Sequence, residues 1–490
     1  MIVQIISNYQ EVTLLLTLAA SLIMSSVATY DPAHIDADKN KSIDRYVNAE
    51  MERQGIPGVA LGIYKNGSIV LAKGYGLANV ENNVPMTADS VLQSGSVGKS
   101  FTATAIMMLV EQGKVGLDDS IADYFPEAPD SWKQIKVANL LSHTSGLAAY
   151  DTPALQKPDG LFDIRRDFSE DELVAAIAKL PIDFQAGENW SYENTNFVLL
   201  GVLIHRVTGQ PYGDFLQQHI FSPLGMKSSR IISDLDIVPN RSAGYEIVAG
   251  ALKNQAWVSP TFNSTADGTI YFTIRDIERW DRALYGESLL KAHSLQQMWT
   301  PYPYGGKTST EGYGFGWEIH DVNGHRVIEH DGAWQGFTTS FSRYVDDQLT
   351  VVVLTNLDSD HSNPAAIVRA VAGMVEPALT VAPRVAIPDD EADLSAKAWA
   401  TFQMLIKGEG KPAGVSSGFL SGLDVEDLRQ SLPDEWSENR PELIARATAG
   451  ADTLSTYKIG KSNNKRLFEV RNNSAGEIMS FGVSHDPDNR

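Results

Sequence analysis

The sequence predicts an α+β fold: a mainly antiparallel sheet flanked by helices, with an all-helical insert, followed by a small α+β C-terminal domain. Three observations support this. Strand hairpins occur near both ends of the first 380 residues, the stretch between them has helix caps and helical periodicity, and a proline-containing segment, Val381 to Pro388, precedes a region of different pattern. Early and late strands of one region commonly share a sheet that helices cover.

The composition limits the functions that the protein can have. The chain has 490 residues, enough for two or three domains, and 43% of them are hydrophobic and 21% charged. With 61 acidic and 40 basic residues its formal net charge is -21, which disfavours a general binder of nucleic acid or of anionic membranes. It has no cysteine, so neither a disulfide nor a lipid-attached cysteine can form.

Residues 1–28 have the shape of a signal peptide. The apolar run Val12 to Met24 is short for a membrane span, and Ser26-Val27-Ala28 has the small-x-small pattern of a cleavage site. No lysine or arginine precedes Lys39, so the usual positive segment is missing. An uncleaved N-terminal anchor or a different start is the alternative. We predict an exported protein, in a bacterial periplasm or secreted, with no stable membrane span once processed.

Three turn signals predict the hairpins of the main sheet. The strand pairs are Gly58–Lys65 with Ser68–Ala72 around Asn66-Gly67, Tyr313–His320 with His325–His330 around Asn323-Gly324, and Thr338–Tyr344 with Leu349–Thr355 around Asp346-Asp347.

Helix caps mark the stretch between these hairpins. The predicted helices are Glu170–Leu180 after the capping box of Ser169, Asn196–Val207 before Gly209, and Ile274–Tyr285 after Thr273. These elements assign residues 40–380 to one domain.

Residues 389–490 form a predicted accessory domain of unknown role, of ordinary domain size. Helices are expected first, at Asp389–Lys407, Val425–Ser431 and Pro441–Ala449, and then strands at Ser455–Ile459, Arg466–Arg471 and Ile478–Val483.

The first candidate site is Ser96 with Lys99. Ser94-Gly95 suits a turn, and the apolar run Phe101–Val110 that follows suits a buried helix ending near Gly113. Residues three apart share a helix face, so the Lys99 amine can reach the Ser96 hydroxyl. Burial lowers the pKa of a lysine and makes it a usable base for a serine nucleophile. Taken alone, the pair is better explained as an N-cap serine followed by a lysine that reaches solvent, and other features are needed to favour catalysis.

Two later clusters can join this pair. Tyr192 and Asn194, two apart in a loop, can face one side, and a phenol beside a buried ammonium is expected to move toward phenolate and accept protons. His330 ends a strand, Gly332 permits close approach of a ligand to the backbone, and the N–H groups of Ala333 and Ser96 can form an oxyanion site. Each cluster alone has an ordinary structural explanation.

In this order, Ser96-x-x-Lys99, Tyr192-x-Asn194 and His330-x-Gly332 resemble the serine β-lactamase and penicillin-binding protein superfamily. The likeness is closest to the branch with class C β-lactamases, D-alanyl-D-alanine carboxypeptidases, peptidases and esterases, and it spans about residues 43 to 376. Further matching segments are Leu117-Asp118-Asp119, Leu140–Leu147, Pro223–Met226 and Ala266-Asp267-Gly268.

The resemblance implies a β-lactamase-like fold and an acyl-enzyme mechanism. Ser96 would attack a carbonyl, Lys99 and Tyr192 would move its proton, and Asn194 would orient the substrate. His330 and Gly332 would line the strand along which the substrate lies, and Ala333 would help hold the oxyanion.

Two departures from the family pattern concern substrate. The third motif is often Lys-Thr-Gly, whereas His330 is mostly neutral at pH 7 if its pKa is the ordinary value of about 6.5, so efficient β-lactamase activity is less expected. The negative charge of Asp331 further disfavours a substrate carboxylate. Such a substrate is expected to bind better below about pH 6.5, where His330 gains charge. Tyr150 stands where class C enzymes have a substrate-binding glutamine and would enlarge an apolar substrate contact.

The sequence therefore predicts a serine hydrolase that acts on an ester, a peptide or amide, or a β-lactam. We expect a small-molecule or peptide substrate, no cofactor and no nucleic acid. Although His320, His325 and His330 recur every fifth residue, strand alternation separates them and we expect no metal site. The alternative is a non-catalytic penicillin-binding-like sensor or binding protein, and the oligomeric state stays open.

Overall fold

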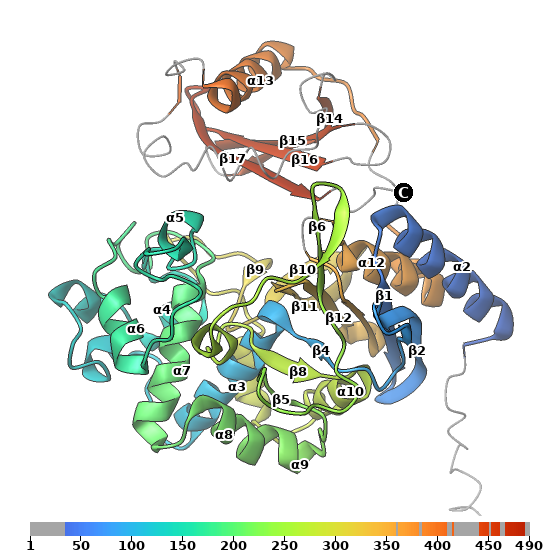
Figure 1. Cartoon of the computed structure of the whole chain (residues 1–490). Coiled ribbons are helices and arrows are strands. Elements are labelled where there is room, and N and C mark those ends of the chain that lie inside the picture. Colours follow the sequence, from blue (N-terminus) through green and yellow to red (C-terminus); the bar gives the residue numbers. More distant parts are fainter. Residues whose placement is uncertain are drawn as a thin grey trace, which may run out of the picture.

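The fold was analysed in a computed structural model, which describes residues 35–358, 361–381, 385–408, 414–415, 441–449, 452–460 and 466–485. The predicted signal peptide and the predicted helix Val425–Ser431 lie outside these residues. Figure 1 shows a large α+β body with a smaller unit, in orange and red, on one side of it.

An eight-stranded antiparallel sheet forms the centre of the larger body, and its strand order is β3-β2-β1-β13-β12-β11-β10-β9. In that order the bounds are Val84–Pro85, Ser68–Asn79, Gly58–Lys65, Leu349–Thr355, Phe337–Tyr344, His325–Trp334, Glu318–Val322 and Gly312–Tyr313. Val59 of β1 pairs with Thr355 of β13, so the early and late strands share one sheet, as predicted. All three predicted hairpins form, but the predicted strand Tyr313–His320 is wrong as one strand, because it is divided between β9 and β10.

Helices cover both faces of this sheet because both faces are apolar. Along β13, Val351 and Val353 pack with the helices α2 (Ala37–Gln54) and α12 (Pro364–Val375). Val352 and Leu354 point to the opposite face and join the core that contains α3 (Gly98–Glu111) and α10 (Ile274–Ala283). This two-residue alternation places a core on each side of the sheet.

The helical insert follows α3. Its helices are α4 (Val137–Leu141), α5 (Pro153–Gln156), α6 (Glu170–Ile177), α7 (Asn194–Thr208), α8 (Tyr212–Leu216) and α9 (Ser222–Leu224), and α11 (Ala292–Met298) comes later. The capping box of Ser169 and the caps at Gly209 and Thr273 are confirmed.

Two smaller sheets were not predicted. One has the order β4-β8-β5 (Leu92–Gln93, Ile270–Phe272, Arg230–Ile231), and the other is the hairpin of β6 (Tyr245–Val248) and β7 (Ala251–Asn254). Ala249 and Gly250 both have positive φ at the tip of this hairpin, as a type I′ turn requires, but Ala-Gly is a weak signal for such a turn.

The C-terminal unit, defined here as α13 (Ala392–Lys407) and the sheet β14-β15-β16-β17, has its own hydrophobic cluster around Phe402 and Phe468. The strands are Glu442–Ala449, Asp452–Ile459, Arg466–Asn472 and Ile478–His485. The predicted helix Pro441–Ala449 is wrong, because Glu442–Ala449 is β14. Its alanines favour a helix weakly, and pairing with β15 together with burial of Leu443 and Ile444 outweighs that preference.

Within the described residues, no helix is both long enough and apolar enough to cross a membrane.

Candidate active site

Ser96 lies in the short 3₁₀ turn η1 (Gly95–Val97), which leads directly into α3. Helix α3 is buried almost throughout, and Phe101 in its first turns stacks on Trp280 with ring centroids 4.0 Å apart. This packing fixes the helix that carries Lys99. Sequence and structure therefore agree on a serine at the entrance to a buried helix.

Lys99 joins three segments that are far apart in the sequence. Its Nζ donates to Ser96 Oγ at 2.9 Å, to Asn194 Oδ1 at 2.6 Å and to the Asp267 carbonyl at 2.5 Å. The side chain is fully buried, and burial lowers its pKa to about 8, although Asp267 and Asp151 act in the opposite direction. Near neutral pH a useful fraction of the amine is therefore unprotonated.

The three contacts of Lys99 fit the neutral amine as well as the ammonium. An ammonium has three donors for three acceptors. A neutral amine has two N–H groups, which suffice for Asn194 and Asp267, neither of which can donate a proton at those oxygens. Its lone pair is then left for the hydroxyl of Ser96, the only one of the three partners with a proton to give.

An outer set of contacts holds the partners of Lys99. Asn194, at the start of α7, donates through Nδ2 to Asp151 Oδ2 at 2.6 Å. Tyr150 donates its hydroxyl to Asp267 Oδ2 at 2.9 Å. Tyr150 is 2% exposed and packs against Phe262, so the expected substrate contact is replaced by a supporting role behind Asp267.

Tyr192 lies beside this pair, with Lys99 Nζ 4.9 Å from its ring centroid. Its buried hydroxyl has no well-formed hydrogen bond among the described residues, although the nearby Ser96 hydroxyl favours its ionised form. Burial outweighs that effect and raises the pKa of Tyr192 well above its usual range. The expected shift toward phenolate is therefore wrong, and Tyr192 is a neutral phenol in the resting site.

His330 on β11 is 2% exposed and uses both ring nitrogens. The Tyr313 hydroxyl lies 2.8 Å from Nε2, and the Asp331 carbonyl lies 2.5 Å from Nδ1, so Nδ1 carries the proton and Nε2 accepts. Burial, together with the charge of Lys99, lowers the pKa of His330 to about 3. The expectation that His330 gains charge below pH 6.5 is therefore wrong.

Gly332 and Ala333 lie directly against the turn that carries Ser96. A Cβ on Gly332 would be 2.7 Å from the Ser96 nitrogen, and one on Gly95, whose φ is +49°, would be 2.3 Å from the Ala333 nitrogen. Trp334 and Phe337 flank a two-residue turn and therefore form a hydrogen-bonded pair. Hydrogen-bonded and non-hydrogen-bonded pairs alternate along an antiparallel ladder, so the next pair, Ala333 with Thr338, has its N–H groups directed away from the partner strand. Two backbone donors, from Ser96 and Ala333, thus lie side by side.

Four side chains of this site were not predicted as site residues: Asp151, Asp267, Tyr313 and His143. His143 stacks on Tyr192 with centroids 4.3 Å apart, and its Nδ1 accepts from the Glu193 N–H at 3.1 Å. Its segment, Leu140–Leu147, contributed to the family resemblance, and that segment is the signal that could have pointed to it.

His320, His325 and His330 do not form a cluster. His320 Nε2 lies 3.6 Å from Glu329, and His325 Nδ1 lies 2.8 Å from Asp347. Across the residues that the structure covers, no group of three metal-ligating side chains occurs.

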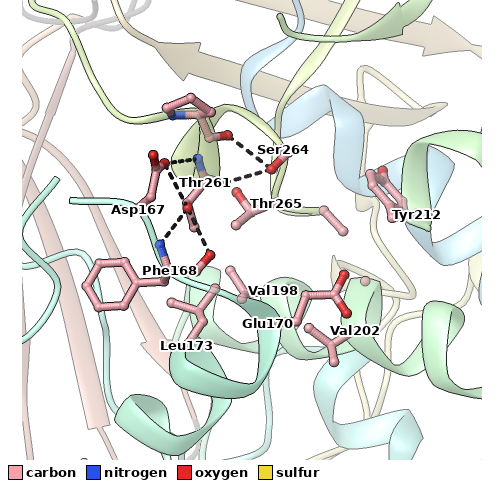
Figure 2. Close-up of a pocket in the computed structure, with 13 residues that line it drawn as sticks. Asp167, Phe168, Glu170, Leu173, Val198, Val202, Tyr212, Thr261, Ser264 and Thr265 are labelled. Atoms are coloured by element: carbon pink, nitrogen blue, oxygen red, sulfur yellow. Dashed lines mark hydrogen bonds between the residues drawn. The ribbon is translucent and has the colours of Figure 1, made fainter. Parts of the chain in front are cut away.

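Two cavities lie near the site. One of about 350 Å³, shown in Figure 2, is lined by Val198 and Val202 of α7 and by Thr265 and Ala266, and none of the predicted site residues lines it. The other, of about 850 Å³, is lined by Trp190 and Tyr313, which pack against each other and against the ring of His143. The second cavity therefore adjoins the Ser96 site.

The family profile named Beta-lactamase matches residues 43–373. The chain belongs to the Beta-lactamase family. The match contains Ser96, Lys99, Tyr192, Asn194 and His330 and ends before the C-terminal unit.

Relatives of this Beta-lactamase family member include penicillin-binding protein 4* of Bacillus subtilis, which is 26% identical over 68% of this chain and 75% of that protein. The D-amino acid amidase of Ochrobactrum anthropi SV3 aligns with a TM-score of 0.58 at 26% identity, over 70% of this chain and 98% of the other. The octameric penicillin-binding protein homologue of Pyrococcus abyssi aligns over 91% of this chain and 98% of its own, with a TM-score of 0.60; at 22% identity it supports the fold alone.

Proposed function

We propose that the protein is a serine hydrolase that forms an acyl-enzyme on Ser96. The observation that carries this proposal is the 2.9 Å contact between Lys99 Nζ and Ser96 Oγ in a fully buried environment. Burial lowers the pKa of Lys99 to about 8, so the amine can accept the proton that makes Ser96 nucleophilic.

In the proposed mechanism, neutral Lys99 takes the Ser96 proton while Oγ attacks the substrate carbonyl carbon. The N–H groups of Ser96 and Ala333 stabilise the oxyanion. Tyr192, a neutral phenol, gives its proton to the leaving group and regains one from the Lys99 ammonium as the carbonyl bond to the leaving group breaks. A water molecule then attacks the ester carbonyl, loses its proton to the same groups, and releases the acid and Ser96.

The third motif favours amide or ester substrates over β-lactams. His330 is neutral throughout the physiological range because burial and Lys99 lower its pKa to about 3, so it supplies no permanent cation for a substrate carboxylate. The likeness to a D-amino acid amidase at 26% identity supports the same choice. We therefore place amides, including D-amino-acid amides and peptides, first and esters second.

A fluorescent alkyl phosphonate tests the nucleophile, because it labels an activated serine whatever the natural substrate is. Labelling with peptide mapping is expected to modify Ser96, and Ser96→Ala is expected to remove both labelling and hydrolysis of a panel of a D-amino-acid amide, a p-nitrophenyl ester and a cephalosporin. A single turnover without repeated release would favour the sensor alternative, and labelling of another residue would reject Ser96.

Two further proposals concern the division of the chain into domains and its export. The first is that residues 40–380 form the hydrolase domain and residues 389–490 an accessory domain. The second is that residues 1–28 direct export and are removed. N-terminal sequencing of the protein recovered from outside the cytoplasm should begin near residue 29, and recovery of the intact N-terminus would contradict cleavage.

A further inference from the structure

The cavity of about 850 Å³ beside the site has walls from both parts of the molecule. Most of its lining comes from β9, β10 and the segment before them, and one lining residue, Arg471, comes from β16 of the C-terminal unit. This cavity therefore brings the C-terminal unit, which lies outside the family match, next to the candidate active site.

The wall of this cavity is aromatic. Trp190, Tyr302, Tyr304 and Tyr313 line it, and Trp190 and Tyr304 remain 36% and 38% exposed. Large apolar side chains left open to a concave surface are a common feature of ligand sites. Tyr313 links the wall to the reacting groups, since its hydroxyl bonds His330 and its ring lies edge-on to Tyr192 with centroids 6.1 Å apart.

One side-chain contact holds Arg471 and leaves most of its guanidinium available to bind a ligand. Its Nε donates to Asp452 Oδ2 at 3.0 Å, and within the described part of the chain its two terminal nitrogens have no partner. A guanidinium anchored at Nε presents these two N–H-bearing nitrogens as a fork that matches a carboxylate.

The cavity also contains charges of both signs. Lys307 and Arg471 are cationic and Glu311 is acidic, whereas burial raises the pKa of Glu318 to about 8 and leaves it mostly protonated near neutral pH. A simple anion would meet repulsion from Glu311, whereas a peptide-type ligand offers N–H donors to the glutamate oxygens and a carboxylate to Arg471. The mixed charge and the aromatic wall together fit an acylated amino acid or peptide with a large apolar side chain.

We propose that Arg471 completes the substrate-binding cavity from the C-terminal unit and binds the free carboxylate of a peptide-type substrate whose apolar side chain lies on Trp190 and Tyr304. This inference rests on the proposed function and deepens it by naming a substrate class. It moves carboxylate recognition away from His330, which is buried, to a residue that the family profile does not include.

Binding to the full chain tests the proposal without requiring turnover. Calorimetric titrations of the Ser96→Ala protein with N-acetylphenylalanine and with its neutral amide, as each enantiomer, measure the preference for the carboxylate. We expect the carboxylate to bind at least about tenfold more tightly than the amide in one enantiomer. Arg471→Gln should abolish that preference, and Arg471→Lys should keep part of it, since the charge remains and the fork is lost.

Lys407→Gln is the matched control, because it removes one positive charge from an exposed position at the end of α13 that does not line the cavity. It should leave the preference unchanged. An equal preference in Arg471→Gln and the Ser96→Ala parent, or no binding of either compound, would overturn the inference. Phosphonate labelling of Ser96 in the wild-type protein separates this outcome from failure of the proposed function, because it tests the nucleophile with a probe that has no carboxylate.

Discussion

The charge of Asp151 should control the pH at which Ser96 becomes reactive. Asp151 is linked to Lys99 through one side chain, Asn194, by two hydrogen bonds of 2.6 Å. The path from Lys99 Nζ to Asp151 Oδ2 consists of these two hydrogen bonds and the C=O and C–N bonds of the Asn194 amide, which are about 1.23 and 1.33 Å long. The two charges are therefore no more than about 8 Å apart. Asp151→Asn removes the negative charge and keeps an acceptor oxygen for Asn194.

The expected shift follows from Coulomb's law. At an effective dielectric of about 20, two charges about 8 Å apart interact by about 2 kcal/mol, which corresponds to about 1.5 pKa units. Removing the anion disfavours the ammonium, so the pKa of Lys99 should fall from about 8 toward about 6.5. At pH 6.5 the neutral amine would rise from about 3% to about half, and labelling of Ser96 should be about 15-fold faster.

The assay is the second-order rate of phosphonate labelling between pH 5 and 10, which reports the pKa values of the free enzyme. Asp214→Asn makes the same charge change at an exposed position on α8 and should leave the midpoint in place. An unchanged midpoint in Asp151→Asn, or a shift to higher pH, would refute the assignment of Lys99 as the base that Asp151 tunes.

Four further outcomes follow from the geometry. Tyr192→Phe should slow hydrolysis by about 10² to 10³, because it removes the proton donor. In urea melts it should raise the free energy of unfolding by about 1 kcal/mol, because it removes a buried hydroxyl without a partner. A loss of stability would contradict this explanation. His330→Gln and wild type should have the same pH profile for carboxylate substrates from pH 5 to 6.5, since burial and Lys99 lower the pKa of His330 to about 3; a wild-type rise below pH 6.5 would argue for a charged His330. Gly332→Ala should lower kcat by about 10² or more, because its Cβ meets the Ser94 carbonyl oxygen at 2.3 Å and the Ser96 nitrogen at 2.7 Å. An active variant would reject the oxyanion geometry. Arg343→Met should destabilise the fold by about 3 to 5 kcal/mol by leaving buried Asp281 unpaired, and Asp281→Leu added to it should restore part of the stability.

The main sheet could be predicted from the sequence because its hairpins depend on local turn chemistry. Asn66-Gly67 and Asn323-Gly324 adopt the left-handed conformations that such turns need, and the segments on either side of each turn pair as antiparallel strands. The strand Glu442–Ala449 could not be predicted in the same way. Its alanine-rich composition favours a helix locally, and its partner β15 is what makes it a strand.

The candidate reacting groups and the lowered pKa of Lys99 were predicted, whereas the protonation predicted for Tyr192 and for His330 was wrong. Ser96, Lys99 and Tyr192 have recognisable spacing, and the structure brings them together as expected. Whether Tyr192 or His330 is charged depends on burial and on partners from distant segments, such as Tyr313 for His330. A pattern of residue types does not contain that information, because a pKa is set by the whole environment of a group.

The candidate site contains buried polar atoms without a hydrogen-bond partner, as do other parts of the described fold. Within the described residues, Tyr192 Oη, His143 Nε2 and Asp267 Oδ1 are buried without a hydrogen-bond partner, and all three residues lie around Lys99 or its direct partners. Each such atom costs about 1 to 3 kcal/mol, and these three differ from the others in lying together at the candidate reacting groups. Their unmet hydrogen bonds are what a substrate and a hydrolytic water can supply, and the binding energy gained there is available to hold the carbonyl against Ser96. The same burial that leaves these atoms unpaired also lowers the pKa of Lys99, so the loss of stability and the reactivity of the serine have one physical cause.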